Sequence, residues 1–217
     1  MDYNFLPGTD TRVRTLCLGT MTFGEQVGEA DSHAILDRSL ERGVNFIDTA
    51  DSYGPHTNEV LIADALHPYP GDLLIATKGG FDRTGPNQWR MNGNPEHIRQ
   101  AIDGSLQRLK LDVIDLWQLH RIDPRFPVEE TLGPVADAVK AGKIRYVGLS
   151  EVNVDQIKQA EQTVPIVSVQ NLYNLGNRQW ENVLDYTVER GMAFIPWYPL
   201  ASGPEKLKSK IADIATR

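Results

Sequence analysis

Two kinds of hydrophobic pattern take turns along the chain from near the N-terminus to about residue 200. Short apolar runs predict strands, and stretches with apolar residues three or four positions apart predict helices. The predicted strands are Leu16–Gly19, Val44–Ile47, Leu73–Thr77, Val113–Leu119, Ile144–Leu149, Ile166–Gln170 and Met192–Trp197. The predicted helices are a segment capped by Asp31 with Ile35, Ser39 and Leu40 on one face, then Asn58–Leu66, Pro95–Leu109 with Asn94 as its N-cap, Glu129–Lys140, Val154–Glu161 and Arg178–Glu189.

The ends of three helices share a pattern in which a glycine is followed at once by a strand. It occurs in Glu41–Ile47 and Glu189–Ile195, and more loosely in Ala141–Ile144. Each glycine is able to take the left-handed conformation that ends a helix. Strands that alternate with helices in this way must run parallel, because each crossover returns the chain to the same end of the sheet.

Seven such strands without interruption favour a closed barrel over an open, doubly wound sheet. No Gly-x-Gly-x-x-Gly turn follows the first strand, which also weakens the dinucleotide-fold alternative. We therefore expect an α/β fold, a parallel (β/α)8 TIM-type barrel, built as a single domain over residues 1–217. The pattern stops at the opening of a helix, Ser209–Arg217, before an eighth strand. We expect either a barrel shortened to about seven strands and open on one side, or a native chain that continues past Arg217.

Composition excludes several classes of function. Apolar residues make up 41% of the 217 residues and charged residues 24%, which is typical of an ordered globular domain. The net charge of −7 and the lack of a basic stripe argue against nucleic-acid binding. No secretory signal and no apolar run of about 20 residues is visible, so we expect a cytoplasmic protein without a membrane span. We interpret the single Cys17 as a small buried residue rather than a reactive thiol.

In a parallel barrel, reactive residues belong at the carboxyl ends of the strands, where the βα loops meet. Taken in order, those positions carry Asp48 with Tyr53 just after it, then Lys78, His120, Ser150, Gln170 and Trp197. Each residue alone has a structural explanation as a cap, a packing residue or a solvated side chain. Together they place a carboxylate, a phenol, an ammonium and an imidazole around one mouth, which favours a catalytic group.

The first four residues suit proton donation to a carbonyl oxygen. A phenol with a pKa near ~10 is a poor donor at neutral pH unless its anion is stabilised. We expect Lys78 to provide that stabilisation beside Tyr53, with Asp48 keeping the lysine charged. Neutral His120 would donate a hydrogen bond to a substrate carbonyl oxygen and favour hydride addition at carbon.

Several ordered segments resemble the motifs of the aldo-keto reductase family. The segment Phe46–Gly54 is similar to the family signature, and Ile75–Lys78 and Leu116–His120 to its second and third catalytic blocks. The likeness runs from Leu18 to about Gly203. Its cofactor-contact segments resemble Gly148–Ser150, Val169–Asn171 and Ile195–Leu200.

The resemblance implies an NADPH-dependent reductase of small aldehydes or ketones, with Tyr53 as general acid and Asp48, Lys78 and His120 as its partners. It also implies that Ser150 and Gln170 bind the nicotinamide carboxamide and that Trp197 stacks on the ring. The full set of cofactor contacts implied is Gly19, Thr20, Met21, Asp48, Ser150, Glu151, Gln170, Trp197, Pro199, Leu200, Ala201 and Gly203. Glu151 departs from the family's usual Asn and can accept a hydrogen bond but not donate one. The segment for the adenosine 2′-phosphate has no counterpart here, so NADPH rather than NADH rests on the resemblance.

The segments Tyr53–His56 and Ala65–Pro70 resemble a bacterial subgroup that includes pyridoxal reductases. Trp89 lies in the long polar loop between Gly79 and Gly93, either as a cap on the substrate pocket or as an exposed loop anchor. Two other functions remain open. One is a Schiff-base aldolase that uses Lys78, and the other is a nucleotide-sensing binding module with little turnover. The five histidines have no close metal-ligand spacing, so we expect no metal, and the sequence leaves the oligomeric state open.

Overall fold

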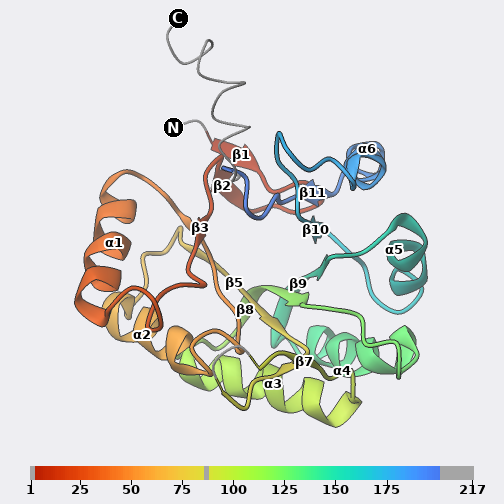
Figure 1. Cartoon of the computed structure of the whole chain (residues 1–217), viewed down its shortest axis with the longest axis horizontal. Coiled ribbons are helices and arrows are strands. Elements are labelled where there is room, and N and C mark those ends of the chain that lie inside the picture. Colours follow the sequence, from red (N-terminus) through yellow and green to blue (C-terminus); the bar gives the residue numbers. More distant parts are fainter. Residues whose placement is uncertain (1–2, 86–87, 201–217) are drawn as a thin grey trace, which may run out of the picture.

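The computed structural model describes residues 3–85 and 88–200, and its centre is a curled parallel sheet (Figure 1). Within the described residues the sheet has seven strands in the order β11-β10-β9-β8-β5-β4-β3, and every pairing is parallel. Its strands are β3 (Leu18–Gly19), β4 (Phe46–Asp48), β5 (Leu74–Gly79), β8 (Ile114–Leu119), β9 (Ile144–Ser150), β10 (Ser168–Gln170) and β11 (Ala193–Phe194). The sheet is a barrel left open between β3 and β11, which confirms the predicted TIM-type fold with seven strands.

The helices lie around the outside of the curled sheet, each between two consecutive strands (Figure 1). They are α1 (Glu29–Glu41), α2 (Thr57–Leu66), α3 (Pro95–Arg108), α4 (Val128–Lys140), α5 (Val154–Ala160) and α6 (Glu181–Arg190). Six of the predicted helices are therefore present, with boundaries shifted by up to three residues. No helix in residues 3–85 and 88–200 has the length and apolar character that a membrane crossing requires.

The start and buried face of the first helix were predicted wrongly. Helix α1 begins at Glu29 after Gly28, whose N-cap position makes no side-chain hydrogen bond, so Asp31 lies within the first turn instead of capping it. Ser32 and Leu36 are its buried residues, whereas Ile35 is 38% exposed. An error of one position along a helix rotates the predicted face by about 100°, which moves an isoleucine from the core to solvent.

Other local signals were read correctly. The Asn94 side chain accepts a hydrogen bond from the backbone N–H of Glu96, and Pro95 occupies the first helical turn of α3. Gly43, Gly142 and Gly191 all have positive φ, at 84°, 74° and 66°. These are the three helix-ending glycines of the repeated pattern, and the left-handed conformation explains why a strand follows so soon.

A short antiparallel hairpin that the sequence did not predict covers the amino ends of the strands. It consists of β1 (Tyr3–Phe5) and β2 (Arg12–Arg14). Leu6 and Val13 are buried in the cluster that fills the barrel interior, together with Phe46 and Leu116. Asn45 ties this hairpin to the start of β4, since its side chain accepts from Arg14 N and donates to Arg12 O. The barrel interior is thus closed at one end and open at the other.

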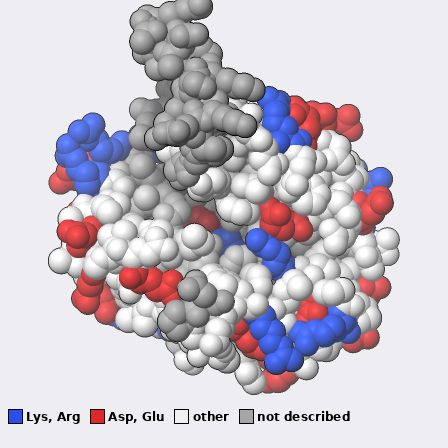
Figure 2. Space-filling model, in the orientation of Figure 1, with Lys and Arg blue, Asp and Glu red and all other residues white. Residues whose placement is uncertain are grey.

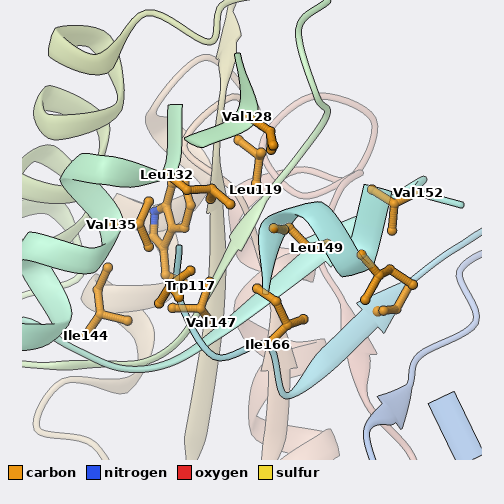
Figure 3. Packing of buried hydrophobic residues seen from close by; sticks show 14 of the residues in the cluster. Trp117, Leu119, Val128, Leu132, Val135, Ile144, Val147, Leu149, Val152 and Ile166 are labelled. Carbon is orange, nitrogen blue, oxygen red and sulfur yellow. The ribbon is translucent and has the colours of Figure 1, made fainter. Parts of the chain in front are cut away.

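The largest hydrophobic cluster lies between the sheet and the helices α3, α4 and α5 (Figure 3). Trp117 of β8 is fully buried there, with Leu132 and Val135 of α4 and Val147 of β9 around it. Because β8 and β9 are held by this packing, the residues at their carboxyl ends are fixed in position. Those ends carry His120 and Ser150.

Candidate active site

A cavity of about 690 Å³ opens at the carboxyl ends of the strands. Figure 2 shows a hollow near the middle of the face in view, where a few basic and acidic atoms lie among uncharged ones. The residues that line the cavity are Cys17, Gly19, Thr20, Met21, Thr22, Asp48, Tyr53, Phe81, Trp89, His120, Arg121, Ser150, Gln170, Ile195, Pro196, Trp197, Tyr198 and Pro199.

A buried chain of polar contacts links three of the predicted catalytic residues. Lys78 Nζ donates to Asp48 Oδ2 at 2.7 Å and lies 3.4 Å from Tyr53 Oη. The same nitrogen donates to the carbonyl oxygen of Thr49 at 2.8 Å, so all three of its protons have acceptors. Lys78 is fully buried, and Asp48 and Tyr53 are 8% and 7% exposed. The order of contacts is carboxylate, ammonium, phenol, with the phenol at the cavity.

His120 completes the predicted group from the neighbouring strand end. Its ring centre lies 5.7 Å from that of Tyr53, with the two planes at 81°. The Ser52 hydroxyl lies 3.4 Å from His120 Nδ1. The direction of this contact depends on the tautomer of the imidazole. The tautomer with its proton on Nε2 accepts from Ser52 at Nδ1 and can donate from Nε2 to a ligand.

The electrostatics of the site keep the imidazole neutral and the lysine charged. Burial, together with the positive charges of Lys78 and Arg121, holds the pKa of His120 well below its usual range. Burial alone would lower the pKa of Lys78, but Asp48 and Tyr53 outweigh it, and the net pKa lies above the ordinary lysine value. The phenol therefore has a neutral imidazole and a fixed cation as neighbours.

Lys78 lowers the pKa of the Tyr53 phenol, as predicted, but it does not bring the net pKa below the ordinary value. Burial raises the pKa of Tyr53 more than the nearby ammonium lowers it, so the net pKa lies above the ordinary tyrosine value. Tyr53 is consequently protonated at neutral pH. Lys78 limits the rise in the pKa of Tyr53, and its ammonium lies beside the phenolate that would form when the proton leaves.

One wall of the cavity is aromatic and comes from a second hairpin within the long loop after β5. This hairpin pairs β6 (Phe81–Asp82) with β7 (Arg90–Met91). The Trp89 ring centre lies 5.4 Å from that of Phe81, 6.4 Å from Tyr53 and 6.3 Å from His120. Although Trp89 is 42% exposed, these contacts put it on the cavity wall, as expected of a cap rather than of a distant loop anchor.

Most of the expected cofactor residues also line the cavity. Gly19, Thr20, Met21, Ser150, Gln170, Trp197 and Pro199 are among its lining residues. The Thr20 hydroxyl is engaged inside the protein, where it donates to Asn58 Oδ1 at 2.8 Å. Leu200 is 89% exposed and is not part of the lining. Ala201 and Gly203 fall outside the residues that the structure describes.

Glu151 does not line the cavity, but its carboxylate holds a residue that does. Glu151 Oε1 accepts from Trp197 Nε1 at 2.7 Å and from the backbone N–H of Leu172 at 2.6 Å. Its own backbone has φ of 56°, in the region that side chains other than glycine rarely adopt. These two hydrogen bonds to one carboxylate oxygen fix the orientation of the indole. The usual Asn would offer only a neutral amide oxygen in its place.

Sequence reasoning missed three residues of the site. Gln118 Nε2 donates to Asp48 Oδ1 at 3.0 Å, and it reaches that atom because Lys78 and Gln118 are paired between β5 and β8. Phe81 and Arg121 line the cavity beside His120. Their positions next to strand ends were visible in the sequence, but only the register shows that Gln118 points into the barrel.

Cys17 packs against the interior cluster but is only partly buried and lies on the cavity lining, so it is more exposed than the predicted buried residue. Burial and the charge of Asp48 nonetheless raise the pKa of its thiol well above the usual range, which keeps it in the unreactive thiol form. Among the residues described, no group of three or more His, Cys, Asp or Glu side chains is placed to hold a metal ion.

Two curated proteins show what the chain is similar to. It is 55% identical over 184 residues to the uncharacterized oxidoreductase C215.11c of Schizosaccharomyces pombe, a match over 85% of this chain and 60% of that protein. It is 35% identical over 203 residues to the probable aldo-keto reductase 1 of Glycine max, over 92% of this chain and 59% of that protein. The chain thus spans about 60% of the length of these relatives.

Solved structures of the same kind superpose on this fold. The holo form of the aldo-keto reductase AKR11C1 from Bacillus halodurans gives a TM-score of 0.81 at 31% identity, over 90% of this chain and 65% of that one. A thermostable aldo-keto reductase, Tm1743, solved with the inhibitor epalrestat, gives a TM-score of 0.86 at 28% identity, over 100% of this chain and 80% of that one. The model of the aldo/keto reductase family matches residues 15–212. Because that match takes in most of the chain, the chain belongs to the aldo/keto reductase family.

Proposed function

We propose that the protein reduces small aldehydes or ketones to alcohols with NADPH, and that Tyr53 is the proton donor. One observation carries this proposal. The buried contacts from Asp48 through Lys78 to Tyr53 end at a cavity that His120 also faces, at the carboxyl ends of parallel strands. A carboxylate, an ammonium, a phenol and a neutral imidazole in this order form an acid suited to a carbonyl oxygen.

Another part of the cavity lining fits a nicotinamide ring. It combines the flat indole of Trp197, oriented by Glu151, with the polar ends of Ser150 and Gln170. Amide and hydroxyl groups of this kind suit a carboxamide, and an indole face suits a flat ring. A bound nicotinamide nucleotide would supply the hydride. NADPH is our choice over NADH because the family likeness favours it.

The residues of this chain would act on the carbonyl oxygen. His120 donates from Nε2 to that oxygen and draws electron density away from the carbonyl carbon. Tyr53 gives its proton to the same oxygen as the alcohol forms. The phenolate left behind lies next to the Lys78 ammonium, which stabilises the negative charge while Asp48 holds the ammonium in place. The aromatic rings of Phe81 and Trp89 exclude water from the reacting group.

The alternative of a Schiff-base aldolase is disfavoured by the state of Lys78. A nucleophilic amine must be neutral, whereas Asp48 and Tyr53 hold the pKa of Lys78 above its ordinary value. The lysine also has three acceptors around it and no open side facing the cavity lining. Lys78 is therefore assigned to charge stabilisation.

The proposal is tested by following the loss of NADPH absorbance with a series of aromatic aldehydes. Tyr53→Phe removes only the hydroxyl, so we expect turnover to fall by about 10²–10⁴ while nucleotide affinity stays within a few fold. Tyr186 of α6 supplies the matched control, because its hydroxyl contacts Glu161 at the end of α5, and Tyr186→Phe should turn over like the unmodified protein. Normal turnover by Tyr53→Phe would contradict the mechanism. Nucleotide binding by the unmodified chain without any turnover would favour the nucleotide-sensing module.

A further inference from the structure

Arg121 is a charged residue of the cavity to which the proposed reduction assigns no contact with the substrate. It follows His120 directly at the end of β8 and is part of the cavity lining. Its Nη1 donates to the carbonyl oxygen of His120 at 2.5 Å and to Ser150 Oγ at 2.9 Å. These two bonds hold the guanidinium across the space between the ends of β8 and β9, next to the catalytic imidazole.

The rest of the guanidinium has no anionic partner among residues 3–85 and 88–200. No described residue accepts a hydrogen bond from its Nε or Nη2, and no described carboxylate lies within ion-pair distance. The two carboxylates near the cavity are already engaged. Asp48 accepts from Lys78 and Gln118, and Glu151 accepts from Trp197 and Leu172.

The Glu151 carboxylate is near enough to act electrostatically on this partly buried guanidinium, but its printed hydrogen bonds come from Trp197 and Leu172. A ligand anion would complete the arrangement with a direct contact. Burial lowers the pKa of Arg121, which reflects the cost of keeping this charge away from water. A guanidinium with two free nitrogens forms a fork that matches the oxygens of a carboxylate or a phosphate. The remaining wall is aromatic, so an oxyanion on a flat body would fit both parts of the cavity.

We propose that Arg121 binds an anionic group of the carbonyl substrate, so that the preferred substrates are aromatic or similarly flat aldehydes and ketones that carry a carboxylate or another oxyanion. The inference rests on the proposed function and narrows its substrate class. Phe81 borders both groups, since its ring centre lies 4.8 Å from the His120 ring centre and 5.9 Å from the guanidinium carbon of Arg121. A flat substrate that packs on Phe81 would therefore have the imidazole and the guanidinium as neighbours.

The first arm of the test compares terephthalaldehydic acid with its methyl ester, which differ in charge but share the ring and the aldehyde. We expect kcat/KM for the acid to exceed that for the ester by about tenfold or more, because a charge-assisted hydrogen bond is lost with the ester. Arg121→Gln should lower kcat/KM for the acid by about tenfold to a hundredfold and for the ester by less than about threefold. Arg121→Lys keeps the charge and should keep part of the preference.

Arg99→Gln is the matched control, because Arg99 is an exposed arginine on α3 that pairs with Glu96. Arg99→Gln should leave kcat/KM unchanged for both the acid and the ester. Equal use of the acid and the ester by the unmodified protein would overturn the proposal. An Arg121→Gln variant that lowers kcat/KM equally for the acid and the ester would also overturn it, because the guanidinium would then have a structural role. A variant that weakens NADPH binding tenfold but keeps the preference for the acid would overturn it too, because the guanidinium would then bind the cofactor.

The second arm measures binding without turnover and separates this inference from the proposed function. Benzoate, phenyl phosphate and uncharged benzamide are titrated against the fluorescence of the tryptophans, two of which, Trp89 and Trp197, line the cavity. We expect the affinity for benzoate or phenyl phosphate to fall at least tenfold in Arg121→Gln, whereas the affinity for benzamide should not change. The two anions distinguish a carboxylate from a phosphate site. Arg121-dependent anion binding without reduction of any aldehyde would refute the reductase and keep the anion site. Reduction of aldehydes with equal binding of benzoate and benzamide would refute the anion site alone.

Discussion

Asp51 gives the structure a pH dependence that a single substitution should abolish. It lies two residues before Tyr53, is 2% exposed, and its Oδ1 has no hydrogen-bond donor among the described residues. Burial and the neighbouring Glu59 carboxylate raise its pKa to about 8, although Arg108 and Ser52 act in the opposite direction. Its backbone N–H donates to the carbonyl oxygen of Lys78, so the group belongs to the loop that carries the proposed acid.

The sign of the effect follows from proton counting. In the unfolded chain an aspartate titrates near ~3.9, and in the folded protein Asp51 titrates near 8. Between these values the folded state binds one proton more than the unfolded state, so the free energy of unfolding falls as pH rises. The slope is about 1.4 kcal/mol per pH unit, which amounts to roughly 3–4 kcal/mol between about pH 5 and about pH 8.

Asp51→Asn is neutral at every pH and nearly the same size. At about pH 5 it should be as stable as the unmodified protein within about 1 kcal/mol, because both side chains are then uncharged. By about pH 8 it should be more stable by roughly 3–4 kcal/mol. The assay is urea unfolding at several pH values, with the difference between the two proteins as the readout, because titrating groups that do not interact with Asp51 cancel in that difference.

Asp123 supplies the control, since it is a second buried aspartate with the opposite shift. Hydrogen bonds from Arg125 and from the backbone N–H of Gly93 hold its pKa well below the usual range. Asp123 is therefore charged in both states over this pH window, and Asp123→Asn should be destabilised by the same amount throughout. A stability difference for Asp51→Asn that stays flat with pH would refute the reasoning.

The remaining predictions concern the site. Lys78→Met should abolish turnover and lower the free energy of unfolding by about 3–5 kcal/mol, since it leaves the Asp48 carboxylate buried without its cation. Adding Asp48→Asn should restore most of that stability in urea unfolding, and a fully stable single variant would show that the pair is not buried. Glu151→Ala should release the Trp197 indole and, like Trp197→Ala, reduce the fluorescence quenching that NADPH causes. Glu151→Gln keeps a hydrogen-bond acceptor, so NADPH should quench the fluorescence of this variant almost normally. Unchanged quenching in Glu151→Ala would mean that the carboxylate does not orient the ring.

The parts of the fold that the sequence predicted depend on local chemistry. Asn94 and Pro95 start α3 because one side chain accepts an orphan N–H and the other has none to offer. Gly43, Gly142 and Gly191 end their helices because each takes a positive φ at little steric cost. Such signals act within a few residues, so they are readable without knowing what the segment packs against.

The parts that were missed depend on contacts far apart in sequence. The strands of the two hairpins are only two or three residues long, too short for a period to be visible. Pro7 and Gly8 lie in the turn of the first hairpin, where Gly8 has φ of 74°, but nothing local shows that Leu6 and Val13 would fill the barrel interior. Those positions are apolar because of residues on β4 and β8.

The site itself divides along the same line. Asp48, Lys78 and His120 were predicted because parallel strands bring their carboxyl ends to one edge, and this topological rule needs only the order of elements. The net pKa of Tyr53 was not predictable in this way, because it depends on how much water the whole barrel excludes. Glu151 is a similar case. Its contact with the cofactor stays a prediction, and only the pairing of residue 172 with residue 197 beside it shows that the carboxylate also holds the indole. Which groups meet follows from the order of strands, whereas the charge each carries and the atom it binds depend on the closed barrel around them.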